Sequence, residues 1–162
     1  MKSLKQSFSI LFVVIHLLSC SSDDSSGQEE EKEESLVTLE GDYIGTWNSN
    51  TDLDITYTDF GISAKFTFAN SEETRLRGEF FATTSFTSCC GSPGNDGTML
   101  INLDGDTIES FTFNDQIIDC TGNFNGSGRI TSKTPYTLQI DFTGNDCDGN
   151  HIGQMIFRRR NN

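Results

Sequence analysis

The chain has 162 residues, of which 34% are hydrophobic, and its 24 acidic and 11 basic residues give a formal net charge of −13. Nucleic acids and anionic lipid headgroups require a basic surface, so this charge argues against both as partners. Residues 36–162 are long enough for one domain with a single core.

Residues 1–19 have the pattern of an export signal. Lys2 and Lys5 precede an apolar run over residues 8–18, which is too short to span a bilayer as a helix. The run closes with Leu17-Leu18-Ser19-Cys20, which resembles the lipobox of bacterial lipoproteins. The resemblance implies cleavage before Cys20 and lipidation of this residue, and two or three acyl chains would anchor the protein stably. The alternative is an ordinary secreted protein whose signal ends near a cysteine.

Residues 20–35 are predicted to form the lipidated cysteine and a disordered acidic tether. The segment 21–35 has seven acidic residues, one lysine and no apolar residue, so burial cannot offset the entropy of ordering it. Its start, Ser21-Ser22-Asp23-Asp24, resembles the acidic export signal of surface lipoproteins of Bacteroidota. That resemblance implies a lipid-anchored protein on the outer membrane, exposed at the cell surface, whereas the alternative is a generic acidic linker.

Residues 36–162 show the period-two alternation of β-strands. Apolar residues alternate with polar ones over residues 62–68, 76–82, 99–103 and 136–142. Turn signals separate the runs, namely Asp59-Phe60-Gly61, Asn70-Ser71, Asp104-Gly105-Asp106, Asn114-Asp115, Thr121-Gly122-Asn123, Thr134-Pro135 and Gly144-Asn145. We expect an all-β domain without a long helix.

Short connections favour antiparallel neighbours, and closing the sheet removes its two edges. The sequence therefore predicts an antiparallel up-and-down β-barrel of 8 to 10 strands. Closure between antiparallel ends needs an even number. Ten strands result if Asn114-Asp115 breaks residues 107–118 into two strands, and eight if one short run is false.

Gly45-Thr46-Trp47 near the start of the domain and Arg158, Arg159 and Arg160 at its end resemble the calycin superfamily, which includes lipocalins. The resemblance implies that Trp47 packs at one barrel end under an arginine of the last strand. A guanidinium over an indole ring stabilises by about 0.5 to 2 kcal/mol. Alternation places Arg159 on the opposite side of its strand from Arg158, and the sequence leaves open which one forms this barrel-end cap.

The stretch from Gly122 to Arg159 is similar to small lipocalin-like lipoproteins of Bacteroidota. This resemblance implies no catalytic motif. The domain is short and lacks the long helix near the end of typical lipocalins, which argues against a roomy cup.

Four cysteines remain after Cys20, and in an exported chain an even number predicts disulfides with three possible connectivities. Cys120 and Cys147 lie in connections separated by two strands and so at the same barrel end, which favours their pairing. Ten strands would place Cys89 and Cys90 at the opposite end, leaving these neighbours to pair with each other. Such a pair is a structural clip or, alternatively, a redox or ligand feature, and its connectivity stays open.

No metal, cofactor or catalytic site is predicted. Asp146, Asp148 and Asn150 begin like a calcium loop, but His151 replaces the required glycine and no glutamate closes the loop. Zinc could use Cys147 and His151, but two further ligands are not evident. His151 is the single histidine outside the signal, and no nucleophile elbow or phosphate-binding loop occurs, so we expect no enzyme.

Two functions remain open for the barrel. Phe66, Phe68, Phe80 and Phe142 alternate inward and could line a site for one small hydrophobic ligand, or they could simply fill the barrel. Alternatively, the barrel is a scaffold whose loops, above all residues 88–97, contact a glycan, a host protein or a neighbouring subunit. An enclosed void above about 300 Å³ would favour the ligand carrier, and a solid interior with exposed apolar loops would favour the scaffold.

Overall fold

The computed structural model describes residues 38–90 and 93–161. The predicted signal over 1–19, the lipidated Cys20 and the acidic tether over 20–35 lie outside the described residues. Within the described part of the chain, no helix is long and apolar enough to cross a bilayer.

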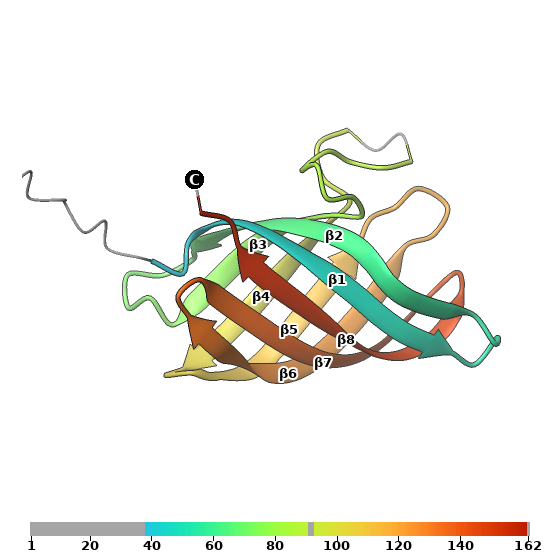
Figure 1. Cartoon of the computed structure of the whole chain (residues 1–162). Helices are drawn as coiled ribbons and strands as arrows, with labels where there is room; N and C mark the ends of the chain where they lie inside the picture. The colour runs from blue at the N-terminus through green and yellow to red at the C-terminus, as the bar shows by residue number, and fades with distance from the viewer. Residues whose placement is uncertain (1–37, 91–92, 162) are drawn as a thin grey trace, which may run out of the picture. The chain divides into compact units, whose positions relative to one another are not determined.

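Eight antiparallel strands form a closed barrel in which each strand pairs with its neighbours in sequence and the last pairs with the first (Figure 1). The predicted all-β, up-and-down barrel is therefore confirmed, with the smallest expected number of strands. The strands are β1 (Gly41–Thr51), β2 (Thr56–Phe68), β3 (Arg75–Phe81), β4 (Gly97–Asp104), β5 (Thr107–Asp115), β6 (Gly122–Lys133), β7 (Tyr136–Asp146) and β8 (Gly149–Arg159).

Three predicted turns lie inside strands instead. At Asp59-Phe60-Gly61, β2 carries an extra residue relative to β1, and this bulge absorbs the left-handed backbone of Asp59 at φ 49°. Asn114-Asp115 continues β5, where both residues pair with β4 and β6. Gly144-Asn145 continues β7, and a side chain at Gly144 would collide with the Phe124 ring. Two of these signals mark a bulge and a close approach, while Asn114-Asp115 pairs regularly with both neighbouring strands, which excludes the ten-strand alternative.

Apolar side chains fill the barrel interior. Trp47 packs in one half of it, with ring centroids 4.4 Å from Phe142 and 5.1 Å from Phe124. Tyr43, Phe66 and Phe157 pack together in the other half, with ring centroids 5.2 to 5.6 Å apart. Of the four phenylalanines proposed as ligand contacts, Phe66, Phe80 and Phe142 are buried in this core and Phe68 packs against it. These rings therefore contribute to the packed core of the barrel.

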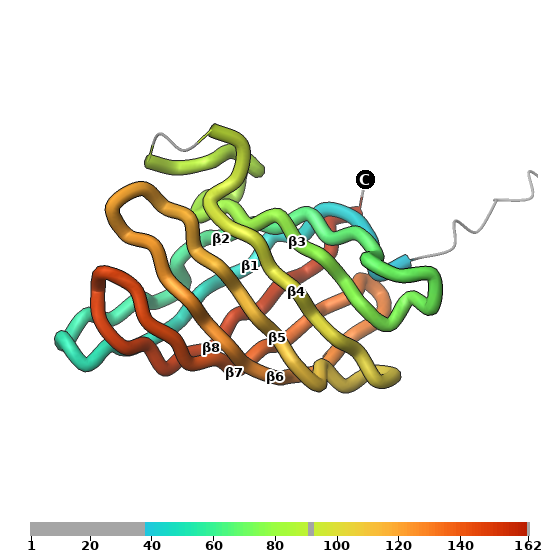
Figure 2. Tube along the Cα trace, turned by 180° about the vertical axis from the view of Figure 1, so that it is seen from behind, coloured from blue at the N-terminus to red at the C-terminus, as the bar shows by residue number. Residues whose placement is uncertain are grey.

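The connections divide the barrel into two unlike ends, visible at opposite sides of Figures 1 and 2. At the turn end, residues 69–74, 105–106 and 134–135 join the strands by short connections. At the loop end lie residues 52–55, 82–90, 93–96, 116–121 and 147–148. Both cysteine pairs belong to the loop end, which corrects the expected placement of Cys89 and Cys90 opposite Cys120. Two strands separate these segments, not three, because β5 is unbroken at Asn114-Asp115.

The expected cap of Trp47 by a terminal arginine does not match the strand register. Trp47 stands opposite Met155 on β8, while Arg158 and Arg159 stand opposite Ile44 and Tyr43. Four residues along a strand are about 13 Å, so the arginines lie at the turn end and Trp47 lies toward the loop end. There Arg159 Nε donates to the carbonyl oxygen of Glu40 at 2.9 Å.

Candidate functional site

A pocket of about 170 Å³ opens at the loop end, above the indole of Trp47. Its walls come from segments far apart in sequence, because the barrel brings every second connection to this end. Rings, carboxylates and members of both cysteine pairs contribute to it. The described lining consists of Trp47, Tyr57, Phe60, Phe80, Ala82, Cys89, Cys90, Asp115, Ile117, Cys120, Asp146, Asp148 and His151.

A buried hydrogen-bond relay connects the floor of the pocket to its acidic wall. Trp47 Nε1 donates to Ser49 Oγ at 2.7 Å, and Ser49 Oγ lies 3.0 Å from His151 Nδ1. His151 Nε2 lies 2.9 Å from Asp146 Oδ1. Trp47, Ser49 and His151 are all at least nine-tenths buried, so each polar atom in the relay needs a partner.

The relay engages both ring nitrogens of His151. Nδ1 lies against Ser49 Oγ, which also accepts from Trp47 Nε1, and Nε2 lies against the Asp146 carboxylate. Ser49, His151 and Asp146 are the residue types of a hydrolase triad. Ser49, however, is outside the described lining of the pocket and its oxygen is engaged with Trp47, so the relay positions the indole and the histidine.

Asp115, the last residue of β5, places a buried carboxyl group in the pocket wall. It is 9% exposed, and its Oδ1 accepts a hydrogen bond from the backbone N–H of Ile117 at 2.9 Å. Burial raises the pKa of Asp115 to about 6, and the nearby charges of Asp146 and Asp96 act in the same direction, while the Ile117 N–H opposes them. Within the described residues, neither a side-chain donor nor a cation contacts this carboxyl group.

Tyr57 closes one side of the pocket. Its hydroxyl donates to Asp148 Oδ2, and its ring stacks on His151 with centroids 5.8 Å apart. Burial raises the pKa of Tyr57 above its usual range, and the hydrogen bond to Asp148 adds to this effect, so the hydroxyl keeps its proton. The tyrosine therefore ties β2 to the turn between β7 and β8.

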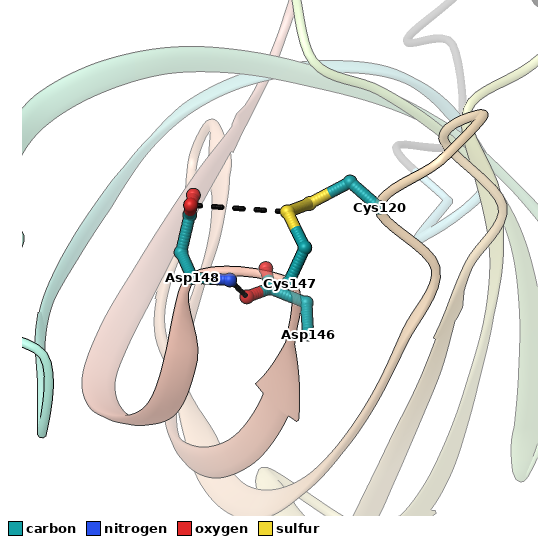
Figure 3. A group of neighbouring side chains, drawn as sticks. All are labelled: Cys120, Asp146, Cys147 and Asp148. Atoms are coloured by element: carbon teal, nitrogen blue, oxygen red, sulfur yellow. Dashed lines mark hydrogen bonds between the residues drawn. A yellow bond between two sulfur atoms is a disulfide. The ribbon is translucent and has the colours of Figure 1, made fainter.

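Cys120 and Cys147 form a disulfide with Cα atoms 4.8 Å apart, which confirms the expected pairing. The bond joins the β5–β6 connection to the β7–β8 turn beside Asp146 and Asp148 (Figure 3). These four side chains could in principle surround a metal ion. With both sulfur atoms in the disulfide, the remaining donors are two carboxylates, and Asp146 Oδ1 already accepts from the Asp148 N–H at 2.7 Å and from His151. The arrangement therefore suits a cross-linked turn better than a metal site.

Asp96 is buried near the end of the β3–β4 connection, and its carboxylate holds part of this connection in place. Its side chain accepts hydrogen bonds from Ala82 N at 2.8 Å, Ser88 Oγ at 2.5 Å and Cys89 N at 3.0 Å. Cys89 is bonded to its neighbour Cys90, one of the connectivities considered from the sequence. The carboxylate thereby fixes this cysteine pair against the pocket.

The structure brings together some of the predicted site residues and separates others. Trp47, Phe80 and three of the four cysteines named for disulfides belong to the described lining, whereas Cys147, Phe66, Phe68 and Phe142 do not. Sequence reasoning missed Ser49, Tyr57, Asp96 and Asp115. Asp96 and Asp115 had been interpreted as parts of a loop and a turn, and the pattern gave no indication that their carboxyl groups are buried.

Comparison of the chain with protein-family models, with curated proteins and with solved structures finds no match.

Proposed function

We propose that this chain is a lipid-anchored protein of the outer cell surface whose barrel binds a small ligand in the loop-end pocket. The observation that supports the binding function is the pocket itself, about 170 Å³ of space bordered by aromatic rings and a few polar groups. Ligand sites in proteins commonly combine an apolar lining with a small number of placed polar groups. The pocket replaces the barrel interior as the candidate site, because the interior is filled by the core.

The proposed surface location rests on the sequence. Leu17-Leu18-Ser19-Cys20 and the acidic run after it have the pattern of a lipoprotein that is exported and tethered. Expression of the full chain in a bacterium that processes such signals, with alkyne-labelled palmitate, tests this part. The label is expected on the wild type and absent from Cys20→Ala, and an unlabelled wild type would contradict it.

Native mass spectrometry tests the binding function. The full protein, purified from its own host in a neutral detergent, is expected to carry a bound molecule that dissociates on activation. Trp47 lines the pocket and is the sole tryptophan of the chain, so its fluorescence should change when the molecule is removed and restored. A protein with no bound molecule, whose fluorescence also responds to no host extract, would contradict the proposal.

A second candidate is a surface protein that uses the loop end as a contact face for a partner protein or glycan. It is favoured by large apolar side chains that are exposed on or near this end, including Leu53 at 62% and Ile118 at 54% exposed. Exposed apolar groups gathered around a rim are typical of interaction surfaces. Pull-down from host-surface extracts with the wild type and with Leu53→Ser plus Ile118→Ser would distinguish this candidate, since these changes leave the pocket lining intact.

A further inference from the structure

Three carboxyl groups line the loop-end pocket without a lysine or arginine beside them. They belong to Asp115, Asp146 and Asp148, and the described lining contains neither basic residue type. His151 contacts Asp146 through Nε2, and no described hydrogen bond joins this ring to Asp115. A buried carboxylate without a cationic partner is unfavourable, and a positively charged ligand would remove that penalty.

Aromatic rings form another part of the pocket lining. Trp47, Tyr57, Phe60 and Phe80 border the same space as Asp115. Aromatic faces attract cations through the ring quadrupole, by about 2 kcal/mol or more when the cation is desolvated. A hard metal ion would need several more oxygen ligands than these walls offer. A neutral apolar ligand would leave Asp115 unpaired, so rings and carboxylate together favour an organic cation.

The volume of the pocket limits the size of the ligand. A dry cavity of about 150 Å³ is enough for benzene, and this pocket has about 170 Å³. A fatty acid or sterol would not fit inside it, whereas a trimethylammonium group or a primary amine on a small ring would. The overall negative charge of the chain also favours the approach of cations.

We infer that the loop-end pocket binds a compact organic cation, an alkylammonium of about the size of choline, with its charge against the Asp115 carboxylate and its alkyl groups against the surrounding rings. This inference rests on the proposed small-ligand function.

The test compares choline with its neutral isostere 3,3-dimethyl-1-butanol on the full protein in neutral detergent. Affinity is measured at pH 8 by Trp47 fluorescence and by calorimetry. We expect choline to bind about tenfold more tightly than the alcohol, because the alcohol has the same shape without the charge. Equal affinities, or no binding of choline up to about 10 mM, would overturn the inference.

Matched variants locate the charge that is responsible. Asp115→Asn keeps the oxygen that accepts from Ile117 and should reduce the preference for choline to less than about threefold. Asp104→Asn removes the same charge from the exposed turn end and should leave the preference unchanged. A preference that survives in Asp115→Asn would also overturn the inference.

Failure of the inference is distinguishable from failure of the proposed function. If the molecule retained by the host-purified protein is neutral and its return quenches or shifts Trp47 fluorescence while choline does neither, the small-ligand function stands and the cation inference falls. If the protein retains no molecule and responds to neither probe nor extract, both fall.

Discussion

The two ends of the barrel are built on different principles. At the turn end, Tyr43, Phe66 and Phe157 pack together, and Arg159 Nε donates to the Glu40 carbonyl oxygen. At the loop end lie two disulfides, a buried histidine and a buried carboxyl group that has no cation beside it among the described residues. The first end contributes packing, and the second holds groups whose burial is costly. Such groups persist where a site needs them.

The largest expected effect concerns the cross-links of the loop end. Replacing Cys120 and Cys147 by serine should lower the free energy of unfolding by about 3.5 kcal/mol, because the bond closes a loop over a separation of 27 residues. The matched change of Cys89 and Cys90 removes a bond between neighbours in sequence and should cost less than about 1 kcal/mol through chain entropy. Urea denaturation of the full protein measures both, and equal losses would contradict the interpretation that Cys120–Cys147 alone staples this end.

The next largest effect is a gain in stability. Asp115→Asn should raise the free energy of unfolding at pH 8 by up to about 3 kcal/mol, because the buried carboxyl group is then never ionised. With a pKa near 3.8 when unfolded and about 6 when folded, the wild type loses stability as the pH rises through this range. The advantage of the variant should therefore vanish near pH 3.5 and reach a plateau above pH 7.

Several other ionisable groups face Asp115, and the comparison with its variant separates them. Asp96 lies in the β3–β4 connection, Asp146 on β7, Asp148 in the next turn, His151 on β8 and Tyr57 on β2. These groups are present in both proteins, so the difference between the two stability curves reports on Asp115. A difference that does not change between pH 4 and pH 8 would show that the carboxyl group is not responsible.

A smaller effect should follow from breaking the relay below the pocket. Ser49→Ala leaves Trp47 Nε1 and His151 Nδ1 buried without their partner and should cost about 2 kcal/mol. Trp47 fluorescence should also shift, because the indole loses its acceptor. Ser127→Ala on the exposed side of β6 is the matched control and should change stability by less than about 0.5 kcal/mol. Equal stabilities would mean that the relay contributes nothing to the loop end.

Much of the fold could be predicted from alternation and turn residues. The runs over 62–68, 76–82, 99–103 and 136–142 all lie within or largely overlap strands. The errors arose where a turn residue serves a strand, as Asp59 does in a bulge and Gly144 does beneath Phe124. The candidate site was less predictable. The residue type of an aspartate such as Asp115 does not show whether its carboxyl group is exposed in a turn or buried in the wall of a pocket.

The calycin-like pattern of Gly45-Thr46-Trp47 with terminal arginines shows the same limit. Both features occur on paired strands, β1 and β8, as the resemblance implies. Only the register shows that Met155 stands opposite Trp47 and that Arg159 stands opposite Tyr43. Register depends on every bulge and turn along the pair, and short motifs do not encode it.

By itself the sequence determined the period-two alternation, the even set of cysteines and the acidic charge, because each depends on residue identity and spacing alone. The tertiary structure decided which connections share an end, since one strand more or fewer moves a later loop to the other end of a barrel. It thereby placed three of the four cysteines, Asp115 and Trp47 around one pocket. Acidic groups and aromatic rings that are far apart in the sequence border the same small volume because the sheet is closed.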